Sequence, residues 1–148
     1  MHDRRRHRAL AQIAVIREAE LGLARQELAL AGVREREAAE AKTRAEARTA
    51  AAVDAWCDHL AGPLNPEFAS ALAAQLVERA GAGEAAAGHA GRMAEALTAS
   101  TGEWCASEAR LRHAEDLLDT SRRVRARDRD ERALEAIEDR VALEWSRK

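Results

Sequence analysis

The chain has 148 residues, of which 34% are charged and only 3% aromatic, and its formal net charge is -2. Much of its 47% hydrophobic fraction is alanine, which buries little area, so the composition excludes a compact globule built on Leu, Ile, Val and Phe. Abundant Ala, Glu, Arg and Leu at heptad-like spacing are instead typical of long helices and coiled coils. The small net charge implies no bulk attraction to nucleic acid or to membranes.

The first predicted helix runs from about residue 4 to about residue 61. Its basic start is not followed by the apolar core of a secretory signal, so a cytoplasmic protein is expected. The helix carries an apolar stripe beside the one expected to face a second helix: Ile13, Ile16, Leu23 and Leu30. This second stripe either widens the buried face or contacts another protein.

A turn is predicted at residues 62–66, because Gly62-Pro63-Leu64-Asn65-Pro66 is the only strong helix breaker in the chain. Asn65 suits the N-cap of a second helix, and Pro66 suits its first helical position. The large apolar residues that flank the turn are expected to form a small cluster across it: Leu60 opposite Phe68, and Trp56 opposite Leu72.

The two halves of the sequence mirror each other about Leu64. Positions at equal distances on either side of Leu64 step by alternating threes and fours, which is the spacing of a coiled-coil seam. The seam positions are Leu10, Ala14, Arg17, Leu21, Ala24, Leu28 and Ala31 in the first half, and Leu97, Ser100, Trp104, Ser107, Leu111, Ala114 and Leu118 in the second. Large residues face small ones across most of the seam. The predicted fold is therefore all-α, a long antiparallel two-helix coiled-coil hairpin with the second helix longer.

The second helix is predicted from about residue 67 to about residue 146. Residues 81–91 contain four glycines, each of which costs a helix interior about 1 kcal/mol relative to alanine. We expect a continuous helix in which the glycines let the two backbones approach closely, with a kink at 81–91 as the alternative.

Past about residue 128 the second helix has no partner left in the chain. This overhang carries large apolar residues at helical spacing: Leu134, Ile137, Val141 and Trp145. Because an isolated helix of this length is marginal in water, the stripe predicts a binding partner. Self-association, or folding back onto the start of the first helix, is the alternative.

The predicted hairpin brings two arginine clusters together at its free end: Arg4, Arg5, Arg6 and Arg8 beside Arg122, Arg123, Arg125 and Arg127. Such like charges repel each other unless anions or salt separate them. The clusters are either a solvated face or a surface that docks onto an acidic protein cavity or onto phosphates, both of which suit the planar guanidinium group.

No residues are spaced as catalysis or metal binding would require. The sequence has no glycine-rich phosphate loop or nucleophile elbow, and its five histidines are scattered, so neither a metal nor a cofactor is expected. Cys57 and Cys105 would lie too far apart in the hairpin to bond within one chain, and we expect both to be small packing residues. The chain is therefore expected not to be an enzyme.

The predicted hairpin has a short basic start, a tight turn before its middle, and a charged, amphipathic end on a longer second helix. In these features it resembles the type III secretion stalk proteins, which are the flagellar FliJ and virulence-system YscO families. The most similar local stretch is residues 129–140, which look like the charged C-terminal segment of those proteins. The chain has no Tyr and few aromatics near the turn, which favours the virulence-type branch.

The resemblance implies a stalk that inserts its paired termini into a hexameric secretion ATPase and links it to the export gate. The ATPase end would comprise the two arginine clusters with Leu134, Ile137, Val141 and Trp145, and the gate end would comprise Trp56, Phe68, Leu72 and Leu76. Secretion chaperones are further implied partners, and the protein would be cytoplasmic and peripheral to the apparatus at the inner membrane. No small-molecule substrate, nucleic acid or membrane insertion is expected.

The alternatives are a self-associating coiled-coil scaffold, or a nucleic-acid-binding helical protein that uses the arginine cluster.

Overall fold

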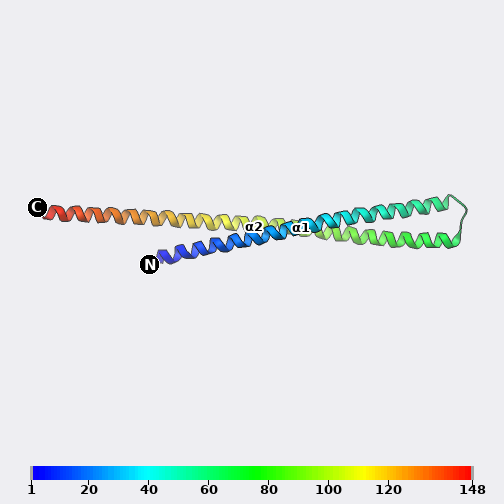
Figure 1. Cartoon of the computed structure of the whole chain (residues 1–148), viewed down its shortest axis with the longest axis horizontal. Helices are drawn as coiled ribbons and strands as arrows, with labels where there is room; N and C mark the ends of the chain where they lie inside the picture. The colour runs from blue at the N-terminus through cyan, green and yellow to red at the C-terminus, as the bar shows by residue number, and fades with distance from the viewer. Residues whose placement is uncertain (1, 148) are drawn as a thin grey trace. The chain divides into compact units, whose positions relative to one another are not determined.

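The computed structural model describes residues 2–147, and side chains from residue 4 onward. Two helices account for nearly all of this range, α1 from His2–Leu60 and α2 from Pro66–Ser146, joined by a short turn (Figure 1). No strand occurs among these residues. The all-α hairpin with the longer second helix is therefore confirmed, although α1 begins and ends slightly earlier than expected.

The chain divides into two compact units, each made of one segment from α1 and one from α2. The terminal unit comprises Met1–Leu23 and Cys105–Lys148, and the turn unit comprises Ala24–Trp104. Within each unit the two segments pack along a seam of buried or half-buried side chains.

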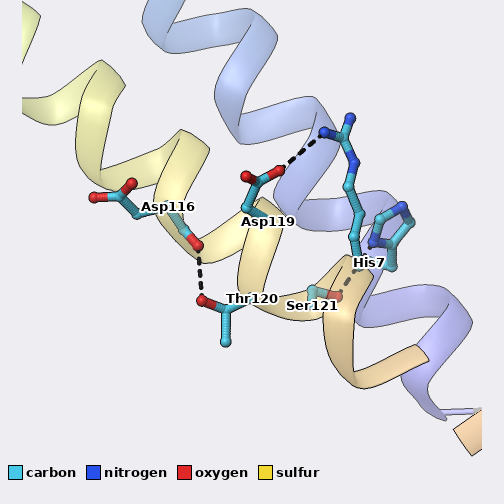
Figure 2. A network of polar contacts seen from close by, with 6 residues as sticks. His7, Asp116, Asp119, Thr120 and Ser121 are labelled. Atoms are coloured by element: carbon cyan, nitrogen blue, oxygen red, sulfur yellow. Dashed lines mark hydrogen bonds and ion pairs between the residues drawn. The ribbon is translucent and has the colours of Figure 1, made fainter. Parts of the chain in front are cut away.

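In the terminal unit the seam follows the predicted register. Leu21 and Ser107, at equal distances from Leu64, are only 4% and 2% exposed. Further along the seam, Ala114 and Leu118 are buried as well. The His7 ring Nδ1 lies 3.2 Å from the Ser121 hydroxyl, and these two residues are again mirror positions (Figure 2). A polar contact at mirror positions fixes the pairing of the two helices independently of the apolar pattern.

The turn unit has a seam of small residues. Ala24, Ala31, Ala38 and Ala52 are its buried positions on α1. The Thr49 hydroxyl lies 3.0 Å from both the Ala45 carbonyl of its own helix and the Arg79 carbonyl of α2. Thr49 and Arg79 are mirror positions about Leu64, so this contact confirms the same register in the second unit.

Asn65 begins α2 as its N-cap. Its side-chain oxygen accepts hydrogen bonds from the backbone amides of Glu67 and Phe68, at 3.1 and 3.3 Å. These amides are among the donors that a helix start leaves without an internal partner, and a side-chain acceptor there contributes about 1 kcal/mol. The predicted cap is therefore confirmed.

The apolar cluster expected across the turn is only partly formed. Leu72 is buried and Trp56 is half-buried, but Leu60 and Phe68 are both exposed. The Phe68 ring instead contacts the His59 ring edge-on, with centroids 5.1 Å apart. The pairing of Leu60 with Phe68 was wrong, because His59, rather than Leu60, occupies the next seam position on α1.

The glycine-rich stretch is helical throughout, since α2 runs without interruption from Pro66 to Ser146. Its glycines do not serve close backbone approach. A Cβ atom built on Gly81 or Gly91 would meet nothing within 4 Å, and one on Gly83 would make ordinary contact with the Thr49 hydroxyl at 3.4 Å. The close-approach interpretation was wrong because, of the four glycines, only Gly83 occupies a seam position.

Both cysteines are exposed and unbonded. Cys57 lies between two seam positions of α1, and Cys105 lies between two of α2, so each side chain points away from the other helix. The expectation that they pack inside the hairpin was wrong.

Candidate functional site

An open hollow of about 470 Å³ lies in the terminal unit between the start of α1 and residues 122–132 of α2. Its lining comes from both helices: Arg4 and His7 of α1, and Arg122, Arg125, Ala126, Asp128, Arg129 and Arg132 of α2. Five arginines and one aspartate therefore line a single hollow.

The local helix geometry explains why four arginines of α2 converge here. Their spacing of three, four and three residues places Arg122, Arg125, Arg129 and Arg132 along one face of the helix, beside the seam. Arg4 approaches from the other helix and completes the lining. The hollow depends on the pairing of the two helices, because neither segment alone would enclose it.

The electrostatic balance around the hollow is strongly positive. Residues 3–8 and 121–132 contain ten arginines and four acidic residues. Arg122 forms an ion pair with Asp119 at 3.1 Å. Among the residues whose side chains are described, the other four arginines of the lining, Arg4, Arg125, Arg129 and Arg132, form no ion pair. Asp128 offsets only part of their mutual repulsion, and solvent and counterions screen the rest.

A set of polar contacts fixes α2 beside this hollow (Figure 2). His7 reaches Ser121 across the seam, and on α2 the Thr120 hydroxyl donates to the Asp116 carbonyl at 2.9 Å. Asp119, next in the chain to Thr120, holds the Arg122 guanidinium. These contacts orient the first turn of the arginine-bearing face.

The terminal unit contains both predicted arginine clusters, and Arg6 lines a second hollow together with Arg125. The members of the clusters differ in whether they line the larger hollow. Arg4, Arg122 and Arg125 line the hollow, whereas the remaining predicted arginines are exposed on the same unit without lining it: Arg5, Arg6, Arg8, Arg123 and Arg127. Sequence reasoning missed His7, Arg129 and Arg132 as lining residues. The heptad pattern continued past Leu118 would have identified His7, because it mirrors Ser121.

The end of α2 presents the predicted apolar stripe to solvent. Leu134, Ile137, Val141 and Trp145 are all exposed, Trp145 by 81%. The seam reaches Asp128, and the heptad positions that would continue it, Arg132, Glu135 and Asp139, are charged. At 3.6 residues per turn the stripe lies on roughly the opposite side of α2 from the seam. The apolar face of α2 therefore changes sides near residue 130.

The predicted gate-end residues do not form one exposed patch. Phe68 is exposed, but Trp56 and Leu76 are half-buried and Leu72 is 9% exposed within the seam. Leu72 is thus part of the hairpin interior, because it occupies a heptad position. Leu64 and Val77 are large exposed apolar residues in this unit that sequence reasoning did not assign.

The second apolar stripe of α1 is exposed. Ile13, Ile16 and Leu23 of the terminal unit, and Leu30 of the turn unit, each remain more than two-fifths exposed. Hence the stripe does not widen the buried face of the hairpin. The four side chains face solvent instead.

Comparison of the chain with protein-family models, with curated proteins and with solved structures finds no match. Within the described residues, neither helix contains an apolar stretch long enough to cross a membrane. The same residues include no cluster of three or more His, Cys, Asp or Glu side chains placed to hold a metal ion.

Proposed function

We propose that this chain is a non-enzymatic coiled-coil stalk of a type III secretion apparatus. In this role its terminal unit inserts into a hexameric secretion ATPase, and its turn unit contacts the export gate. The observation that carries the proposal is the composition of the terminal unit, in which arginines from both ends of the chain gather beside an exposed amphipathic helix.

The arginines supply the docking chemistry. Guanidinium groups make bidentate hydrogen bonds to carboxylates, so an acidic pore lining would neutralise a surface that the chain itself leaves positive. The contribution of these contacts falls with salt, because exposed charges are screened over about 8–10 Å at physiological ionic strength.

The exposed stripe at the end of α2 supplies apolar area. Burial of Leu134, Ile137, Val141 and Trp145 against an ATPase surface would contribute about 25 cal/mol for each Å² removed from water. At the other end, Phe68 and Leu64 are the exposed apolar residues through which the turn unit would contact the gate. Secretion chaperones are further partners in this proposal.

Charge reversal tests the role of the basic end. The variant Arg122→Glu, Arg123→Glu and Arg125→Glu should lose most of the stimulation of the cognate ATPase and of its hexamer formation. A matched control reverses three exposed arginines of the turn unit, Arg25, Arg34 and Arg36, and should stimulate as the native chain does. Full stimulation by the first variant would refute insertion through the basic end.

A self-associating scaffold is the second candidate, and the exposed stripes favour it. Ile13, Ile16 and Leu23 on α1 could pair with the same surface of another copy. Light scattering separates the two candidates, since the stalk is expected to be a monomer without its ATPase. A stable dimer that persists at low micromolar concentration would favour the scaffold.

A further inference from the structure

We propose that the arginine-lined hollow of the terminal unit binds an oligophosphate anion, either free or as the phosphate chain of a nucleotide. The proposal does not rest on the stalk function, because it concerns the isolated chain and a small ligand. It turns a general affinity of arginine for phosphate into one defined site, which is assembled from a segment of α1 and a segment of α2 that lie more than a hundred residues apart in the chain.

The charge of the lining is unbalanced. Five arginines face one hollow together with the single carboxylate of Asp128, and four of them have no acidic partner among the described side chains. Positive groups held this close repel one another, and a multivalent anion between them converts that repulsion into attraction. The gain is greatest for a ligand that concentrates several negative charges in a small volume.

The arginines of the lining are arranged to contact an extended ligand. Arg122, Arg125, Arg129 and Arg132 line one wall along a single face of α2, and Arg4 lies on the wall formed by α1. An extended ligand can thus be contacted by several planar guanidinium forks at once, each able to donate two hydrogen bonds to phosphoryl oxygens. A chain of two or three phosphates presents such oxygens along its length.

The size of the hollow suits a small ligand. Its volume of about 470 Å³ is within the range of small-molecule sites. The carboxylates of a protein surface, by contrast, are carried on separate side chains, so they concentrate less charge in the same volume. The dimensions therefore favour a small polyanion over an acidic peptide.

Titration calorimetry tests the proposal on the full chain, with sodium tripolyphosphate and with ATP in the absence of magnesium, at constant ionic strength. We expect saturable binding of one anion per chain. The double variant Arg125→Gln and Arg129→Gln removes two lining arginines and should weaken binding by more than about tenfold, because hydrogen bonds between charged groups are the stronger ones and two of their donors are lost.

The matched control is Arg123→Gln with Arg127→Gln. It removes the same charge from the same turns of α2 but leaves the lining intact, so its Kd should stay within about twofold of the native value. The pair Arg4→Gln and Arg5→Gln repeats the comparison on α1, where only Arg4 lines the hollow. Circular dichroism of each variant establishes that the helices persist.

The possible results of the calorimetry distinguish a defined anion site from general electrostatic attraction to the basic surface. Equal binding of tripolyphosphate and ATP would identify the phosphate chain alone as the ligand, and tighter binding of ATP would identify a nucleotide. Equal weakening by the lining and control variants would overturn the proposal, as would the absence of saturable binding. Citrate that binds as tightly as tripolyphosphate would overturn the preference for phosphate. None of these results bears on ATPase stimulation, which is measured separately.

Discussion

Leu21 and Leu23 are the same residue type two positions apart, yet they have opposite surroundings. Leu21 occupies a heptad position and is 4% exposed, whereas Leu23 lies on the outer face and is 64% exposed. A helix places residues two apart on different faces, so the heptad phase alone decides which leucine holds the terminal unit together.

We predict that Leu21→Ala lowers the free energy of unfolding by about 2 kcal/mol, near the low end for a buried leucine because a seam of two helices can partly close around the gap. Leu23→Ala is the matched control and should change it by less than about 0.5 kcal/mol. Urea unfolding followed by circular dichroism measures both. Equal effects of the two substitutions would contradict the heptad phase assigned to α1.

At the scale of the helix, the glycines of α2 reduce stability without serving a contact. Gly81 and Gly91 have open space where a Cβ atom would lie, and both are within an uninterrupted helix. Alanine at these positions loses less backbone entropy on folding and meets no neighbour.

The double substitution Gly81→Ala and Gly91→Ala is therefore expected to stabilise the chain by about 1–2 kcal/mol in total and to raise the thermal midpoint. Thermal unfolding monitored at 222 nm gives the result. If the midpoint falls instead, the two glycines have a structural role that the open space around them does not reveal.

The last part of α2 buries none of its described residues. Every described residue from 131 onward is exposed, while the seam positions Ser107, Ala114 and Leu118 are buried. Helical segments that lack packing open readily, because their stability comes from propensity alone.

Hydrogen exchange should consequently be fast for amides in residues 131–146 and slow for those in residues 107–118. Mass spectrometry of peptides from the two segments measures the difference. Comparable protection of both segments in the isolated chain would show that the C-terminal stripe already has a partner, such as another copy.

At the scale of the whole molecule, charge is unevenly divided between the two units. The turn unit carries 8 basic and 12 acidic residues and the terminal unit 16 and 14, so the net charge of -2 divides into -4 and +2. The net charge of the whole chain does not show that the two units have opposite net charges. Any attraction of the chain for anionic partners thus belongs to the terminal unit and should weaken as salt increases.

The antiparallel pairing itself is testable with spin labels in a background of Cys57→Ser and Cys105→Ser. Labels at Gln12 and Asp116 in the terminal unit, and at Arg44 and Glu84 in the turn unit, occupy exposed mirror positions. Each pair should give a short, narrow distance distribution, since packed helix axes lie about 8–10 Å apart. A broad distribution centred at long distance in either unit would contradict the hairpin.

The sequence by itself determined the hairpin, its register and its cap. The alternating spacing about Leu64 and the turn chemistry of Asn65 are local features, and both contacts at mirror positions, His7 with Ser121 and Thr49 with Arg79, agree with them. Periodicity is enough to predict the pairing, because the contact face of each helix in a two-helix seam is set by the spacing of its small and apolar residues. That spacing can be read directly from the sequence.

Only the tertiary structure decided which side chains converge and which face solvent. It left Cys57 and Phe68 exposed, and gathered Arg4 with Arg129 and Arg132 around one hollow. These outcomes depend on where each residue lies around its helix relative to the partner helix. Composition and apolar spacing predict that two helices pair. Which side chains line the hollow beside the seam depends on residues from both helices, so it follows only from the paired structure.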